Sequence, residues 1–155
     1  MPTSQTPAPT SATTTAATDH TAILTRFHDA ANTGDPAAVA EAMDAYFAPD
    51  LDFHTPIPMD VTGIEALKRV WEILLRAFPD LRVTVEETIA QADKVVVRNT
   101  VTGTHLGEYR GRPATGKSVS YREIFIFRFA GGRVVEIQGV VDVLSQLRQL
   151  GMVPS

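Results

Sequence analysis

The chain has 155 residues, of which 44% are hydrophobic and 21% charged, and a formal net charge of −4. These values are typical of one soluble globular domain, and the scattered Lys and Arg residues argue against nucleic-acid binding. Without cysteine there can be no disulfide or thiolate nucleophile, and no apolar run reaches the roughly 20 residues that a membrane-spanning helix needs. We therefore expect a cytoplasmic protein with no nucleic-acid or membrane partner.

Residues 1–18 are rich in Thr, Ala and Pro and carry no charged side chain. They lack the basic start and apolar stretch of a secretory signal. Such a segment cannot bury enough apolar surface to offset its loss of conformational entropy. We predict a disordered tail at 1–18, followed by one domain at 19–155.

Two helices are predicted at the start of the domain. Apolar residues recur at helical spacing over residues 23–31, and the sequence Asn-Thr-Gly at 32–34 ends this first helix. Asp35 and Pro36 suit the N-cap and first position of a second helix, whose buried face runs over residues 39–47.

A short strand and a third helix come next. The strand is predicted at 51–54, before a proline-rich turn. Thr62 and Glu65 have the spacing of a capping box, and the helix that follows presents an apolar face over residues 67–78. Pro79 ends it.

Beyond residue 79 the hydrophobic period changes to two, which predicts four consecutive antiparallel strands and a closing helix before Gly151. The strands are expected at 82–91, 94–105, 118–129 and 133–141, and the helix at 143–150. We therefore predict an α+β fold, in which a curved antiparallel sheet covers three helices and leaves a pocket between the two layers.

The segment from Gly103 to Lys117 resembles the strand–loop–strand signature of the SnoaL-like polyketide and ester cyclases. Three further segments, at 32–35, 129–136 and 147–151, agree with this family in order and spacing. The resemblance implies an NTF2-like cone that binds a small hydrophobic, polyketide-like ligand. It also implies ring closure of aromatic polyketide esters by an intramolecular aldol reaction, without metal or organic cofactor; other members hydroxylate polyketides, and many have no assigned activity.

Aldol closure requires a base that removes a proton from carbon, a donor for the enolate oxygen and an acid for the attacked carbonyl. We therefore consider ionisable residues on apolar strand faces, where burial can move a pKa toward neutrality. The candidate catalytic residues are Glu123, His105 and Asp142. The candidate substrate-binding residues are His54, Trp71, Asn99, Tyr121, Phe125 and Gln138.

Each catalytic candidate also has a structural interpretation. A cross-strand arginine could neutralise Glu123, and a backbone carbonyl near a loop could satisfy His105. Asp142 could act as the N-cap of the helix that starts at residue 143. Asn99 could serve as a structural hydrogen-bonding residue, and Trp71 could be core with one edge on the cavity.

The chain departs from the aldol cyclases at two positions. The resemblance places the family's catalytic aspartate at Gly139 and its helper histidine at Phe125. Gly139 cannot transfer a proton, so the standard cyclase mechanism does not carry over unchanged.

Three hypotheses follow. The first is a cofactor-independent cyclase or related tailoring enzyme that uses the candidates above. The second is a non-catalytic ligand-binding or dimerisation module, in which an arginine neutralises Glu123 and Asp142 serves as a cap. The third is a hydroxylase or hydrolase variant; an epoxide-hydrolase-like site would need an Asp–Arg–Asp relay, which the residues after Arg98 do not provide.

The four histidines show no paired ligand spacing, so we expect no metal site. We expect a homodimer or homotetramer that pairs through the open sheet face. The alternating Thr and Arg residues of 94–105 predict a fairly polar interface.

Overall fold

Alternating apolar residues in the second half of the chain form four antiparallel strands, as the period of two predicted. The structure is a computed structural model that describes residues 11–54 and 59–154, with side chains from residue 19 onward. Tight turns at Ala92 and at Gly131-Gly132, where φ is positive, join two of the strand pairs. The strands are β2 (Arg82–Gln91), β3 (Lys94–Thr104), β4 (Ser118–Ala130) and β5 (Arg133–Val141).

A fifth strand, β1 (Phe47–Phe53), extends the sheet. It pairs in parallel with β5, which gives the strand order β1-β5-β4-β3-β2. The strand predicted at 51–54 therefore begins four residues earlier than expected. Phe47, predicted as the last residue on the buried face of the second helix, is fully buried. It belongs to the strand instead, because its backbone is extended after the end of that helix and pairs with Val134.

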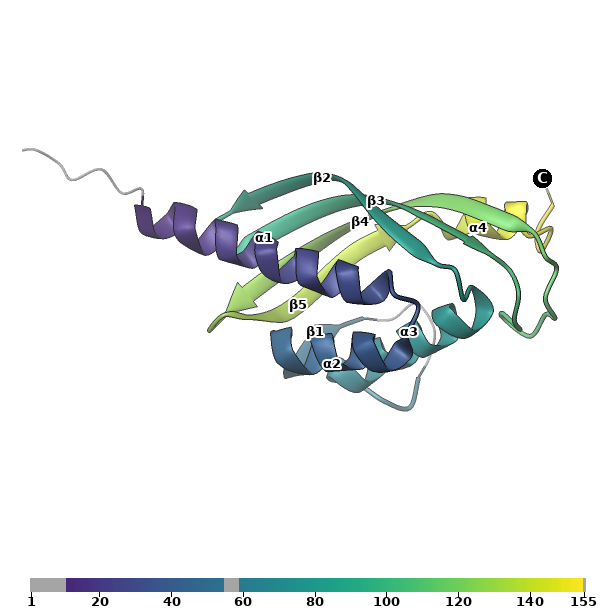
Figure 1. Cartoon of the computed structure of the whole chain (residues 1–155), viewed down its shortest axis with the longest axis horizontal. Coiled ribbons are helices and arrows are strands. Elements are labelled where there is room, and N and C mark those ends of the chain that lie inside the picture. Colours follow the sequence, from purple (N-terminus) through teal and green to yellow (C-terminus); the bar gives the residue numbers. More distant parts are fainter. Residues whose placement is uncertain (1–10, 55–58, 155) are drawn as a thin grey trace, which may run out of the picture.

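Three helices cover one face of the sheet, and a fourth follows β5 at its far end (Figure 1). The first begins inside the segment predicted to form a tail; residues 1–10 lie outside the described residues, so the tail stays a prediction. The helices are α1 (Ser11–Ala31), α2 (Pro36–Tyr46), α3 (Gly63–Ala77) and α4 (Val143–Gln149).

The helix caps agree only in part with the sequence analysis. The Asp35 carboxylate accepts a hydrogen bond from the backbone N–H of Ala37, as predicted for an N-cap. Thr62 is the N-cap residue of α3, but its side chain makes no capping hydrogen bond. The predicted capping box is therefore wrong, and Glu65 instead lies 3.6 Å from Lys68 in an i,i+3 ion pair.

The end of α1 is fixed to the edge of the sheet by one side chain. Asn32 donates from Nδ2 to the Val83 carbonyl at 2.9 Å and accepts from the Val83 N–H at 2.7 Å. Its amide group thus continues the hydrogen-bond ladder of β2, where a sixth strand would otherwise pair. This contact holds α1 across β2 and β3, and so sets one wall of the space between the layers.

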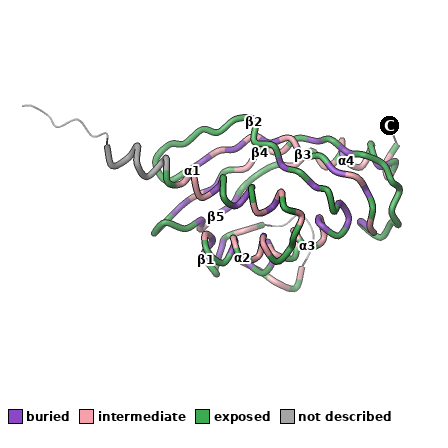
Figure 2. Tube along the Cα trace, viewed as in Figure 1, coloured by how far each residue is buried: buried purple, intermediate pink, exposed green. Residues whose placement is uncertain are grey.

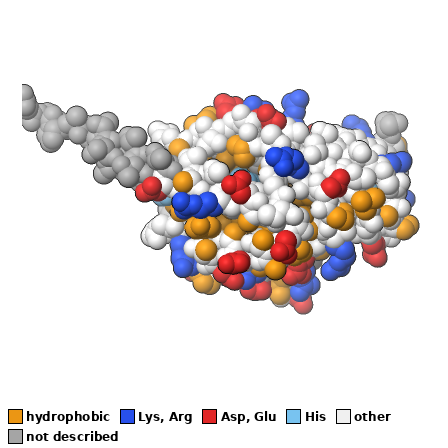
Figure 3. Space-filling view, viewed as in Figure 1, with side chains coloured by type: hydrophobic (Ala, Val, Ile, Leu, Met, Phe, Trp, Pro, Cys, Tyr) orange, Lys and Arg blue, Asp and Glu red, His pale blue; other side chains and the backbone are white. Residues whose placement is uncertain are grey.

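Buried residues concentrate where the sheet faces the helices (Figure 2). The inner face of β3 is formed by Val95, Val97, Asn99 and Val101, which are all almost fully buried. On the surface seen in Figure 3, Lys and Arg side chains are interspersed with Asp and Glu. Within the part of the chain that the structure describes, no helix is long and apolar enough to cross a membrane.

The inward face of β5 changes parity midway. Val134 is buried, and after an irregularity in the pairing with β4 the inward residues become Ile137, Gly139 and Val141. The effect of this irregularity is to place Gly139 opposite Phe125 on the helix-facing side of the sheet.

Candidate functional site

A cavity of about 610 Å³ lies between the inner face of the sheet and helices α1 and α3. Most of its lining is aliphatic or aromatic, including Trp71 and Leu74 of α3 and Phe125 and Phe127 of β4. A space of this volume, lined mainly by apolar side chains with few polar groups, suits a small organic molecule.

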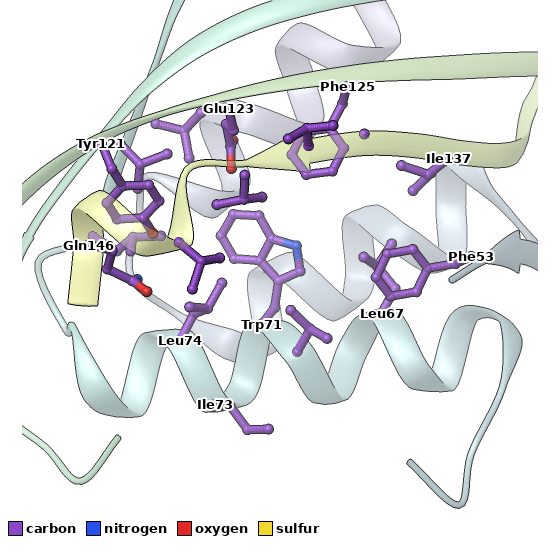
Figure 4. Close-up of a pocket in the computed structure, with 18 of the residues that line it drawn as sticks. Phe53, Leu67, Trp71, Ile73, Leu74, Tyr121, Glu123, Phe125, Ile137 and Gln146 are labelled. Carbon is purple, nitrogen blue, oxygen red and sulfur yellow. The ribbon is translucent and has the colours of Figure 1, made fainter. Parts of the chain in front are cut away.

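Glu123 supplies a carboxylate to this apolar cavity. Its side chain extends from β4 toward the Trp71 ring, between Tyr121 and Phe125 (Figure 4). Burial raises the pKa of the Glu123 carboxyl above its ordinary value, because the charged form loses its hydration. Among the described residues no arginine or lysine forms an ion pair with it, so the neutralising arginine considered from the sequence is not found.

Asn99 is the hydrogen-bond partner of Glu123. The two residues face each other across β3 and β4, and Asn99 donates from Nδ2 to Glu123 Oε1 at 3.0 Å. This bond favours the carboxylate and partly opposes the effect of burial on its pKa. Asn99 does not line the cavity, and its Oδ1 atom is buried without a partner. Asn99 therefore orients the Glu123 carboxylate from a position outside the cavity lining.

The other predicted binding residues fall into two groups. Tyr121, Phe125 and Trp71 line the cavity from β4 and α3, and Trp71 also meets Phe27 edge-to-face, with the ring centres 5.7 Å apart. His54 and Gln138 also contribute to the lining, but both residues are exposed. The His54 imidazole lies 2.9 Å from the Asp52 carboxylate. Gln138 pairs with Ile126 of β4, on the face of the sheet that points away from the helices.

His105 and Asp142 lie outside the cavity lining. His105 is fully buried between the rings of Phe78 and Tyr109, and its Nδ1 accepts a hydrogen bond from the backbone N–H of Thr115. Asp142 is the N-cap of α4, where its carboxylate accepts from the Ser145 N–H at 3.1 Å. The structure thus brings neither residue together with Glu123, and it gives each a structural role.

The two positions where the chain departs from the aldol cyclases are direct neighbours. Phe125 and Gly139 are paired residues on β4 and β5, and both line the cavity. A Cβ atom at position 139 would collide with the Phe125 ring and would lie 2.6 Å from the backbone oxygen of Ile124. The phenyl ring therefore fills the space that a side chain at position 139 would need.

Three buried polar residues of the cavity, and the exposed Arg110 in its lining, were not identified from the sequence. His28 is buried on α1, and desolvation lowers its pKa to about 4, so the imidazole is neutral at pH 7. It follows Leu24 and Phe27 on the apolar face of the helix, and this spacing could have identified it. Tyr109, in the loop between β3 and β4, and Gln146, on α4, are also buried at the cavity, and neither carries a recognisable sequence signal.

The loop that carries Tyr109 is tied to the end of α3. Leu106 and Gly107 donate their N–H groups to the Ala77 carbonyl at 2.9 and 3.1 Å. The backbone approaches so closely here that a Cβ atom at Gly107 would collide with the carbonyl oxygen of Arg76. The loop is thereby fixed, and it holds Tyr109 against the end of the cavity.

These residues give the cavity the elements of acid/base chemistry. Glu123 can accept or return a proton, Tyr121 can donate a hydrogen bond, and most of the surrounding side chains are apolar. Burial, the nearby Glu123 carboxylate and Tyr109 raise the pKa of the Tyr121 hydroxyl far above its ordinary value, so it stays protonated at neutral pH.

Comparison with known proteins agrees with this geometry. The model of the SnoaL-like polyketide cyclase family matches residues 21–150. Two aklanonic acid methyl ester cyclases, DauD of Streptomyces sp. (strain C5) and DnrD of Streptomyces peucetius, are each 30% identical over 132 residues. The alignments cover 83% of this chain and 80% and 88% of the two relatives.

A solved structure shows the same arrangement of helices and strands. AclR from Streptomyces galilaeus, a proposed hydroxylase, superposes with a TM-score of 0.76 at 30% identity, covering 90% of this chain and 89% of AclR. The family match extends over most of the chain, and it includes every strand and the residues that line the cavity. The chain therefore belongs to the SnoaL-like polyketide cyclase family.

Proposed function

We propose that the protein is a cyclase-type enzyme that acts on a small hydrophobic polyketide by acid/base chemistry, with Glu123 as the base. The observation that carries this proposal is the Glu123 carboxyl itself. It lies at an apolar cavity, has a raised pKa and is held by Asn99 without a neutralising cation among the described residues. A base with a pKa shifted toward neutrality is suited to removing a proton from carbon.

The proposed reaction is an intramolecular aldol closure. Glu123 removes a proton from a carbon next to a carbonyl group, and the electron pair forms an enolate. The enolate carbon attacks a second carbonyl of the same molecule, so that one carbon–carbon bond forms and the attacked oxygen becomes an alkoxide. The alkoxide then takes up the proton held by Glu123, which restores the carboxylate. Protons and electrons balance within the substrate and Glu123.

The curated relatives supply the substrate class for this proposal. Both are aklanonic acid methyl ester cyclases, so an aromatic polyketide methyl ester is the first candidate substrate. The cavity volume of about 610 Å³ is large enough for a fused-ring molecule of that class. His105 and Asp142 have structural partners outside the cavity, and this favours Glu123 among the three carboxylate and imidazole candidates.

A non-catalytic ligand-binding module is the second candidate function. It is supported by the pair Phe125 and Gly139, which replaces the acid/base residues of the aldol cyclases, and by the capping role of Asp142. The absence of an arginine beside Glu123 among the described residues weighs against it. A hydroxylase variant rests on the likeness to AclR alone.

The experiment uses a panel of aromatic polyketide methyl esters incubated with the protein in D₂O, and mass spectrometry follows both cyclised product and deuterium uptake. The proposal predicts cyclised product from at least one ester, with deuterium retained at the acidic carbon. Glu123→Gln is expected to abolish both signals, whereas Asp142→Asn and His105→Phe test the other two candidates under the same conditions. Ligand binding without product or exchange across the panel would favour the binding module.

A further inference from the structure

One end of the cavity contains three polar side chains that the proposed reaction does not yet use. Tyr109, Tyr121 and Gln146 are 4%, 5% and 2% exposed, and all three line the cavity. They come from the β3–β4 loop, β4 and α4. We call these three residues the oxygen-binding cluster. Buried polar groups of this kind usually have their hydrogen-bonding capacity satisfied, so any capacity left over points toward a ligand.

The hydrogen bonds within the cluster have a direction. The Tyr109 hydroxyl donates to Gln146 Oε1 at 3.1 Å, which engages the amide oxygen. The part of the Gln146 amide that remains is its NH₂ group, which can only donate. The Gln146 side chain is near enough to Tyr121 to lower the pKa of its hydroxyl, against the larger effect of burial. Figure 4 shows the Tyr121 ring and the Gln146 side chain adjacent at the same end of the cavity.

This arrangement leaves the Tyr121 O–H as a donor without an acceptor. Among the described residues no hydrogen bond donated by the Tyr121 hydroxyl is found, and the neighbouring Gln146 amide oxygen already accepts from Tyr109. Burial keeps the phenol protonated, so the donor is retained at neutral pH. A donor held in this way fits an oxygen with free lone pairs and no proton of its own to donate.

We propose that the oxygen-binding cluster binds a ketone or ester carbonyl oxygen of an aromatic ligand, through a hydrogen bond donated by Tyr121. Glu123 lies two residues from Tyr121 on the same face of β4. A ligand whose carbonyl oxygen meets Tyr121 therefore presents the adjacent carbon toward the carboxylate. In that position Tyr121 would stabilise the enolate oxygen that forms when Glu123 removes the proton.

The short helix α4 holds the cluster in place. Gln149, one turn beyond Gln146, pairs with the backbone of Ser120: its Oε1 accepts from the Ser120 N–H at 2.7 Å, and its Nε2 donates to the Ser120 carbonyl at 2.8 Å. Ser120 precedes Tyr121 on β4. The two bonds therefore tie α4 to β4 at the residue next to Tyr121.

The proposal rests on the cavity being the ligand site of the proposed function, and its test needs no turnover. 9-Fluorenone and fluorene share a flat three-ring frame and differ in one carbonyl group. The dissociation constant of fluorene divided by that of fluorenone therefore reports carbonyl recognition. Equilibrium dialysis would measure both ligands with the full chain. The wild type is expected to bind fluorenone more tightly, and Tyr121→Phe should reduce the ratio about three- to tenfold, as the loss of one hydrogen bond predicts.

Two further variants separate recognition from stability. Tyr46→Phe alters the one tyrosine that does not line the cavity and should leave the ratio unchanged. Tyr109→Phe frees the Gln146 amide and should reduce the ratio by less than Tyr121→Phe. An unchanged ratio in Tyr121→Phe, an equal fall in Tyr46→Phe, or no binding of either probe would overturn the proposal. Dialysis measures binding and the D₂O experiment measures proton removal, so a failure of the base and a failure of the cluster can be told apart.

Discussion

The phenyl ring of Phe125 lies over Gly139, its partner on β5, and occupies the space of the missing side chain. The two positions are therefore coupled: a side chain at 139 requires a different side chain at 125. If the resemblance places the aldol-cyclase aspartate and histidine correctly at 139 and 125, those two residues would have to change together. Glu123, the base in our proposal, lies two residues farther along β4, opposite Val141.

The coupling predicts that Gly139→Ala destabilises the protein. The new methyl group would collide with the Phe125 ring and press on the Ile124 carbonyl oxygen, and such overpacking costs about 1–3 kcal/mol. Urea unfolding measures the change. In a Phe125→Ala background the same substitution should cost clearly less, because the ring is gone. Equal costs in the two backgrounds would show that the two side chains are not coupled.

Asn99 should control the ionisation of Glu123. The hydrogen bond from Asn99 favours the carboxylate, so its removal in Asn99→Leu is expected to raise the Glu123 pKa further. A ¹³C NMR titration of the glutamate carboxyl carbons measures this pKa without any substrate. Thr100→Val, on the outer face of the same strand, is the matched control and should leave the titration of Glu123 as it is. A titration midpoint that stays the same or falls in Asn99→Leu would contradict the positioning role.

His28 should make the protein sensitive to acid. Its pKa is lowered by burial from 6.5 to about 4, against an opposing attraction from Asp29 and a hydrogen bond that the imidazole donates to the Leu24 backbone carbonyl. The unfolded chain therefore binds the proton more readily between these two pH values. The contribution to stability is complete above pH 6.5 and is lost as the pH falls toward 4, by roughly 3 kcal/mol in all.

Urea unfolding at pH 7 and pH 4.5 tests this dependence. The wild type is expected to lose more free energy of unfolding at pH 4.5 than His28→Gln does. His54→Gln, which changes an exposed histidine, should behave like the wild type. If His28→Gln and the wild type lost the same amount, the imidazole would not be buried in neutral form.

The homodimer or homotetramer expected from the sequence stays a prediction. On the sheet face opposite the helices, Ile124 and Val140 are paired neighbours that are 46% and 76% exposed, and Ile126 lies beside them. Ion pairs of Arg98 with Glu87 and of Arg128 with Glu136 are found on the same face. Light scattering after size exclusion should give a multiple of 16.8 kDa for the wild type and a smaller species for Ile124→Lys. A wild-type monomer would contradict the expectation.

Most of the fold was predictable because local pattern determines it. The change of hydrophobic period after residue 79 located the four long strands, and the alternation on β3 and β4 placed Asn99 and Glu123 on the inner face. The parallel pairing of β1 with β5 was not predicted, because it joins residues far apart in the sequence and leaves no local signal. The hydrogen bonds of Asn32 to β2 were missed for the same reason.

The candidate site was predicted less completely. Glu123, Tyr121 and Phe125 were found from one strand, because a glutamate in an aromatic row is costly to bury. His105 follows the inner face of β3 and Asp142 follows the end of β5, but each side chain makes its hydrogen bond with a nearby backbone N–H group instead of facing the cavity. The alternation of residues along a strand cannot predict such local hydrogen bonds. Tyr109 and Gln146 reach the cavity from a loop and a short helix, and tertiary packing alone determines their positions.

The rate of hydrogen–deuterium exchange at an acidic substrate carbon tests the role of Glu123 most directly. An aromatic polyketide methyl ester in D₂O would be followed by NMR with the wild type, Glu123→Gln and Glu87→Gln, the last being an exposed glutamate on β2. We expect exchange with the wild type and Glu87→Gln, and a loss of about 100-fold or more with Glu123→Gln, as for removal of a general base. Exchange at the wild-type rate in Glu123→Gln would contradict the assignment of Glu123 as the base.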